Sequence, residues 1–251
     1  MMVHRDEIHA ALNSLLKPDL FKDYCPNGLQ IEGKEQIGHV VTGVTACQAL
    51  IDAAVDCGAD AILVHHGYFW RDEDPCIRGM KGNRIKSLLA SELSLFAYHL
   101  PMDCHPWLGN NAGLGRAMGF NDFGPMRAED GTFPVFSAVL SAPIPVVDIV
   151  ARLTEALGRE VLVEGDRMIS SVAWCTGGGQ GYIGQAADAG VDLFVTGEVS
   201  EQTIHVARER GLAFIAAGHH ATERFGVQAV GEFLATEMGI KHTFVDIDNP
   251  A

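Results

Sequence analysis

The sequence has little positive charge, no closely spaced cysteines and no long apolar run. Its 18 Lys and Arg residues stand against 32 Asp and Glu, and the resulting formal charge of −14 argues against general nucleic-acid binding. The six cysteines are scattered without a CxxC pair, which is typical of reduced thiols in the cytoplasm. The apolar segment of a signal peptide and the roughly 18–20 apolar residues of a membrane helix are both missing. We therefore expect a cytoplasmic protein without membrane contact, in which an anionic ligand would need a local cation.

Apolar material is plentiful, since 47% of the 251 residues are hydrophobic. At about 150 residues per domain, this length allows one large domain or two modest ones. Short apolar runs at 40–44, 61–64 and 93–98 alternate with helical patterns near 48–57 and 82–91. Buried strands that alternate with helices predict a parallel sheet covered on both faces.

The pattern changes between about 125 and 170 and then resumes. A strand at 133–140, a helix at 146–157 and a strand at 160–163 predict a small α+β layer there. The alternation of strand and helix then continues at 171–175, 181–189, 193–196, 200–210 and 213–217, before a last helix and strand. We predict an α/β protein of two similar halves, 1–124 and 125–251, with mainly parallel sheets.

A weak internal repeat supports two similar halves. At an offset of 132 positions, five residues in 13 match: Gln48 with Gln180, Ala54 with Ala186, Asp56 with Asp188, Gly58 with Gly190, and Asp60 with Asp192. The same register aligns His66 with Glu198. If each half is one strand-helix-strand unit, equivalent strand ends are expected to face one shared cleft.

Adjacent histidines follow two of the predicted strands. His65 and His66 follow the predicted strand at 61–64, and His219 and His220 follow the predicted strand at 213–217. Both pairs therefore lie at the carboxyl ends of strands, where open α/β sheets place their sites.

Carboxylates lie close to these histidines in the sequence. The segment HLPMD (99–103) follows a third strand, and its prolines predict irregular backbone with Asp103 on a loop. His219 and Glu223 are four residues apart and share one face if the final helix begins here, while His220, three residues from Glu223, remains an alternative.

These residues make a candidate ligand set for metal ions: His65, His66, Asp103, His219 and Glu223. Five ligands exceed the need of one tetrahedral ion, whereas a carboxylate that bridges two ions would use them all. Mixed nitrogen and oxygen donors favour zinc, iron, manganese or nickel over magnesium or calcium.

Two further features lie at neighbouring strand ends. Glu198 is a candidate general base or a partner of a metal ligand, or else a carboxylate at the start of a helix; His99 is a candidate proton shuttle. The glycines Gly177, Gly178 and Gly179 follow a strand and are expected to bind an anionic substrate. The same loop also matches G-x-G-x-x-G, which leaves a dinucleotide site or a simple tight turn as alternatives.

Several motifs together resemble one known family. They are PNGLQ (26–30), VHHG (64–67), HLPMD (99–103), the glycine loop, TGE (196–198) and GHHATE (218–223). In this order they are similar to the Nif-three-like dinuclear metal-centre family, often named GTP cyclohydrolase type 2 homologues, and to its short bacterial members. The resemblance spans nearly the whole chain.

The resemblance implies the same five metal ligands, with His219 in place of His220. It also implies two divalent ions in the cleft that separates the halves, and a ring-shaped homohexamer. The leading functional hypothesis is a metal-dependent hydrolase, similar to a GTP cyclohydrolase type 2, that acts on a small anionic substrate such as a nucleotide. The alternatives are a metal-binding assembly or regulatory protein without catalysis, and a dinucleotide-binding enzyme.

Overall fold

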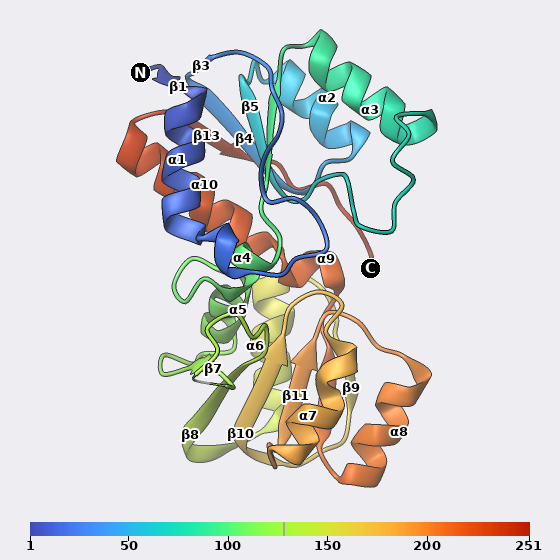
Figure 1. The fold of residues 1–251 in the computed structure, drawn as a ribbon. Helices are drawn as coiled ribbons and strands as arrows, with labels where there is room; N and C mark the ends of the chain where they lie inside the picture. Colours follow the sequence, from blue (N-terminus) through green and yellow to red (C-terminus); the bar gives the residue numbers. More distant parts are fainter. Residues whose placement is uncertain (128) are drawn as a thin grey trace. The chain divides into compact units, whose positions relative to one another are not determined.

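The computed structural model describes residues 1–127 and 129–251 (Figure 1). The chain forms two compact units, of which the first contains Met1–Met102 and Gly226–Asp248 and the second contains Asp103–Phe225 and Asn249–Ala251. The two units are joined within the helices α4 (Leu100–Cys104) and α10 (Arg224–Met238). Within the described residues, no helix is both long enough and apolar enough to cross a membrane.

The first unit is a sheet with helices on both faces. In chain order its remaining elements are β1 (Val3–His4), α1 (Arg5–Leu16), η1 (Pro18–Leu20), β2 (Gly28–Ile31), β3 (Gln36–Ile37), β4 (His39–Thr45), α2 (Gln48–Asp56), β5 (Ala61–His66), α3 (Gly79–Ala90), β6 (Ser94–Ala97) and β13 (Lys241–Phe244). The main sheet has the order β13-β4-β5-β6-β2, and only the edge strand β2 pairs antiparallel. Helices α2 and α3 lie on one face and α1 and α10 on the other (Figure 1). The predicted parallel sheet is confirmed.

The second unit has a comparable centre with different edges. Its elements are α5 (Asn110–Ala117), β7 (Gly124–Pro125), β8 (Phe136–Pro145), α6 (Val146–Leu157), β9 (Leu162–Glu164), β10 (Met168–Cys175), η2 (Gln180–Tyr182), α7 (Ile183–Asp188), β11 (Leu193–Thr196), α8 (Glu201–Arg210), β12 (Ala213–Ala216) and α9 (His219–Thr222). The sheet order is β7-β8-β10-β11-β12-β9. The central strands β10, β11 and β12 are parallel, and the outer strands pair antiparallel.

Burial on both faces explains the continuous apolar runs of the central strands. In β10, Val172 and Trp174 pack with α6 in one cluster, whereas Ala173 and Cys175 belong to the cluster on the opposite face. Because successive side chains of a strand point to opposite faces, a sheet covered on both sides needs apolar residues at every position.

The division of the chain differs from the predicted boundary at 124/125. The first unit already ends at Met102, so that Asp103 belongs to the second unit, and Gly226–Asp248 returns to the first. The reason is strand pairing, since β13 adds to the edge of β4 in parallel register. A long-range pairing of this kind leaves no local signal in the sequence.

Three local predictions also need correction. The strands β8 and β9, expected in a small α+β layer, are strands of the second unit's own sheet. Asp103 lies in the short helix α4 instead of a loop, since proline at the start of a helix lacks only an N–H that would be unpaired anyway. The last helix is interrupted at Glu223, which separates α9 from α10.

The internal repeat reappears in the hydrogen bonds of two aspartates. Asp60 accepts the amides of Gly38 and His39 at 2.9 and 3.2 Å, and Asp192 accepts those of Ser170 and Ser171 at 2.9 and 3.1 Å. In each unit a cationic side chain, Lys34 or Arg167, binds the other carboxylate oxygen at 2.9 Å. Asp60 directly precedes β5 and Asp192 directly precedes β11. The weak sequence match therefore marks the same local arrangement in both units.

Asp60→Asn should destabilise the first unit in a pH-dependent way. Burial raises the pKa of Asp60, but the hydrogen bonds from Lys34, Gly38 and His39 outweigh it and hold the pKa below its usual value. The stabilisation is therefore present above the unfolded pKa of about 4 and is lost as the pH falls through the lower folded pKa. We expect a loss of about 1–3 kcal/mol at pH 7 that shrinks toward pH 3, measured by urea unfolding. The exposed Asp56→Asn is the control, and a cost for Asp60→Asn that does not depend on pH would contradict this account.

Candidate metal centre

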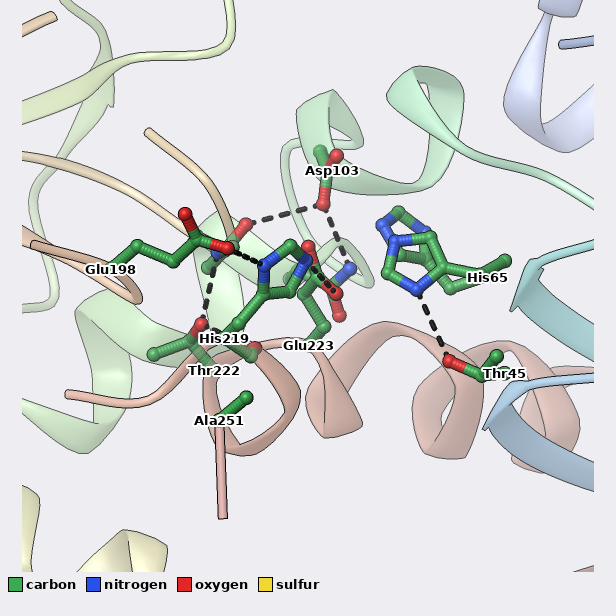
Figure 2. Close-up of polar contacts among 12 residues, drawn as sticks. Thr45, His65, Asp103, Glu198, His219, Thr222, Glu223 and Ala251 are labelled. Carbon is green, nitrogen blue, oxygen red and sulfur yellow. Dashed lines mark hydrogen bonds and ion pairs between the residues drawn. The ribbon is translucent and has the colours of Figure 1, made fainter. Parts of the chain in front are cut away.

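His65 and His66 end the middle strand of the first unit's sheet. His65 is fully buried, and its Nδ1 lies 3.1 Å from the carbonyl oxygen of Tyr98. Since a carbonyl can only accept, Nδ1 carries the proton and Nε2 is left as the nitrogen that can bind a metal. The Nδ1 of His66 lies 3.2 Å from the hydroxyl of Thr45 (Figure 2).

His99 joins this pair within the first unit. His99 follows β6. One ring nitrogen from each of His65, His66 and His99 lies within 4.8 Å of the other two. Its Nδ1 donates to Oδ1 of Asp23 at 2.7 Å, which leaves Nε2 on the other edge of the ring. The structure thus brings His99 to the histidine pair, as the sequence predicts.

Asp23, which no sequence pattern singled out, orients His99. Besides His99, its carboxylate accepts the amides of Tyr24 and Leu100 and the side chain of Asn27, at 2.6 to 2.9 Å. Burial raises the pKa of Asp23, but the hydrogen bond and charge of His99 and the hydrogen bond of Asn27 lower it below its usual value. The spacing of four between Asp23 and Asn27 was the available signal.

Two residues of the PNGLQ motif bind the backbone beside these histidines. Asn27 accepts the backbone N–H of His99 at 2.7 Å, and Gln30 binds both backbone groups of Tyr68. A Cβ at Gly67 would lie 2.2 Å from the side-chain oxygen of Gln30, so only glycine fits after the histidine pair. The motif residues hold the loops after two strands in place.

Asp103 is buried in the second unit, where its carboxylate is oriented by two donors. The side chains of Asn110 and Thr176 donate to its Oδ1 at 2.8 and 3.1 Å. Asp103 is 6% exposed and Glu223 only 3%. Burial raises the pKa of the Cys175 thiol, and the charges of Asp103 and Glu223 raise it further.

His219 lies between two glutamates of the second unit (Figure 2). Its Nε2 is 3.2 Å from Oε2 of Glu223, as the spacing of four predicts, and its Nδ1 is 2.7 Å from Oε1 of Glu198. The other oxygen of Glu198 accepts the side chain of Gln180 at 2.8 Å. His219 is therefore the imidazole in contact with Glu223, and Glu198 orients it.

The glutamates change the protonation of this histidine. Burial lowers the pKa of His219, but the hydrogen bonds and charges of Glu223 and Glu198 outweigh it and raise the pKa to about 9. The hydrogen bond to His219 in turn lowers the pKa of Glu198. Such a group binds a cation well, because a metal ion can replace the proton on Nε2 while the Nδ1 contact remains.

The glycine loop makes room for these side chains. Gly177 has φ +63, and a Cβ there would lie 2.0 Å from Oε1 of Glu223 and 3.1 Å from Nε2 of His219. The amides of Gly177 and Gly179 donate to the hydroxyls of Thr222 and Thr196, each at 3.0 Å. Of the predicted anion-binding glycines, Gly178 is exposed, whereas Gly177 and Gly179 are buried.

The donors suit divalent ions, and His65, His66 and His99 form a candidate ligand group within the first unit. The first unit supplies imidazole nitrogens, and the second supplies one imidazole and two buried carboxylates. Buried carboxylates are costly unless a cation compensates them, and mixed nitrogen and oxygen donors suit zinc, iron, manganese or nickel. The glycine at position 177 keeps the space beside these donors open.

The chain matches one known family over nearly its whole length. Residues 3–250 match the family described as Duf34/NIF3 (NGG1p interacting factor 3). The chain belongs to the Duf34/NIF3 family.

Relatives of this Duf34/NIF3 chain cover its whole length. A Pseudomonas aeruginosa protein named GTP cyclohydrolase 1 type 2 homolog is 55% identical over 92% of both chains, and one of the same name from Escherichia coli K12 is 51% identical over 98% of both. A solved structure described as protein ybgI, of unknown function, is 50% identical with a TM-score of 0.94 and covers 99% of this chain and 100% of its own. The protein TTHA1606 from Thermus thermophilus is 33% identical with a TM-score of 0.86, at the same coverage.

Gly177→Ala tests the steric role of the loop in this Duf34/NIF3 chain. We expect the free energy of unfolding to fall by about 1–3 kcal/mol, because a residue with a Cβ is strained at φ +63 and its methyl group would meet Glu223. The matched control is Gly184→Ala in α7, where a Cβ meets no heavy atom of the described residues within 4 Å and should be neutral or stabilising. Equal stability of both variants in urea unfolding would contradict the steric role.

Proposed function

We propose that the protein is a dinuclear metal-dependent hydrolase. In this proposal a pair of divalent cations, zinc, iron, manganese or nickel, is bound through five ligands: His65, His66, Asp103, His219 and Glu223. The observation that carries the proposal is the common arrangement of the histidines, since Nδ1 of each lies beside an oxygen atom, from Tyr98, Thr45 or Glu198, that fixes its ring. When bound, two such ions would lower the pKa of a coordinated water toward 7 and polarise the bond under attack.

The chain's own residues have distinct roles in this proposal. Glu198 holds the ring of His219 through Nδ1 and is the proposed general base. His99 donates a hydrogen bond from Nδ1 to Asp23, and in this proposal it exchanges a proton with the substrate at Nε2. Both side chains thereby support general acid–base chemistry beside the ligand positions.

A nucleotide is the substrate class best supported. The relatives are named GTP cyclohydrolase 1 type 2 homolog, and we propose the same activity here, with attack on the imidazole-ring carbon of the purine. The strongly acidic chain needs local cations for such an anionic substrate, and the proposed ions would supply them. Gly178, exposed beside Glu198 and His219, is the glycine proposed to contact the substrate.

The first alternative is a metal-binding assembly or regulatory protein. Family membership supports the proposed cytoplasmic homohexamer under either function. Coordination distinguishes the two functions, since a catalytic site keeps water on its ions and a structural site is closed by protein ligands. Light scattering should give six copies per particle.

A dinucleotide-binding enzyme, the second alternative, has less support. In the fingerprint each glycine permits a close approach, yet a Cβ at Gly181 or Gly184 meets no described heavy atom within 4 Å. Glu198, which would bind a ribose, has both oxygens engaged by His219 and Gln180.

Chelation tests the hydrolase directly. The purified protein should lose hydrolysis of GTP, within a panel of nucleotides, when its metal is removed, and should regain it with added zinc, iron, manganese or nickel. Asp103→Asn, which keeps the side-chain size, should lose both metal and activity while its thermal unfolding stays cooperative. Hydrolysis that is indifferent to chelation, or full metal content in Asp103→Asn, would reject the proposal.

Glu198→Gln separates orientation from ligation. The variant keeps an acceptor for His219 but removes the negative charge, so metal affinity should fall about 10- to 100-fold. Titration with zinc in a competing chelator measures this affinity. Glu201→Gln, an exposed charge in the first turn of α8, is the control and should bind zinc like the parent protein. Unchanged affinity in Glu198→Gln would rule out the orienting role.

A further inference from the structure

A cavity of about 530 Å³ lies beside Glu198 in the second unit. Its walls include Arg159, Leu162, Glu198, Gly218 and Ala251. Arg159 is the only basic side chain among the residues that line it. The cavity therefore adjoins the carboxylate that orients His219, but its walls are different residues from the proposed metal ligands.

The backbone is shaped to hold Arg159 in this wall. The residue follows Gly158, whose left-handed conformation at φ +69 ends α6 and turns the chain. Gly218 lies opposite with φ +99, and a Cβ there would be 2.4 Å from Nη1 of Arg159. A glycine at position 218 is thus required for the guanidinium to lie where it does.

Two donors converge on one oxygen at this wall. The carbonyl oxygen of Ala251 accepts the backbone N–H of His220 at 3.2 Å and Nη1 of Arg159 at 3.4 Å. Figure 2 shows Ala251 close to the turn that carries His219 and Thr222. One acceptor at 3.4 Å uses little of what a guanidinium offers, since Arg has five N–H donors in a planar fork that matches the oxygens of a phosphate.

We propose that this cavity is the subsite for a phosphate group of the substrate, bound by Arg159 and the amide of His220, and that the backbone oxygen of Ala251 in the segment Asn249–Ala251 competes for these two donors until substrate arrives. This inference rests on the proposed function, because it assigns the anionic end of the substrate to the wall next to His219. Of the two acidic side chains in the lining, Glu198 is neutralised by its contact with His219, and Glu160 is exposed. A phosphate is therefore the ligand that the single cation of this cavity favours.

Binding of inorganic phosphate and of tripolyphosphate to the full-length, metal-loaded protein tests the subsite. Isothermal titration calorimetry should show that Arg159→Gln weakens binding about tenfold or more. Arg210→Gln changes the net charge equally but removes an exposed arginine paired with Asp188, and should leave binding unchanged. Metal content is measured in each variant, so that a difference reports on Arg159 and not on lost ions.

The competing segment is tested by its removal. A variant without Asn249–Ala251 should bind phosphate at least about threefold more tightly, because the competing oxygen is gone. In the hydrolysis assay, Arg159→Gln should raise KM for a nucleotide far more than for the matching nucleoside, with kcat unchanged.

The outcomes separate this inference from the proposed function. Phosphate binding that Arg159→Gln does not weaken, or that loss of the segment does not strengthen, overturns the subsite while leaving metal binding and hydrolysis intact. Conversely, a protein that binds phosphate through Arg159 but hydrolyses none of the nucleotides confirms the subsite and refutes the hydrolase.

Discussion

The fixed orientation of imidazole rings is the constraint on which the candidate centre depends. In both units Nδ1 of a histidine is held by an oxygen, from a carbonyl at His65, a hydroxyl at His66, and carboxylates at His99 and His219. Each contact fixes the plane of its ring, and at His219 the other nitrogen, Nε2, faces Glu223. The surrounding motifs are explained by this requirement, because Asn27, Asp23 and the loop glycines hold or make room for these rings.

The two units share a framework but differ at the strand ends. Asp60 and Asp192 bind equivalent backbone amides, and the parallel pairs β4–β5 and β10–β11 have equivalent registers. At the carboxyl end, however, the position of His66 in one unit corresponds to Glu198 in the other. Equivalent strand ends therefore carry different side chains. One carries imidazoles, and the other carries a carboxylate that orients an imidazole.

Local patterns predicted the central strands, the helices that cover them and the contact of His219 with Glu223, because periodicity and spacing act within a few residues. They could not predict that β13 joins β4, since that pairing links residues about 200 positions apart. Asp23 escaped notice because its importance arises from four contacts, two of them with residues more than 70 positions away. The loop glycines were predicted to bind an anion, yet two of their amides serve threonine hydroxyls, which only the folded structure reveals.

X-ray absorption spectroscopy of the zinc-loaded protein tests the central claim most directly. If the oriented imidazoles and carboxylates hold a pair of ions as proposed, the spectrum should contain only nitrogen and oxygen neighbours at about 2.0–2.1 Å, the multiple scattering of imidazole, and a second zinc at about 3.5–4 Å. A sulfur neighbour at about 2.3 Å would instead place the metal on a cysteine. Either that sulfur or the absence of a zinc–zinc distance would contradict the account.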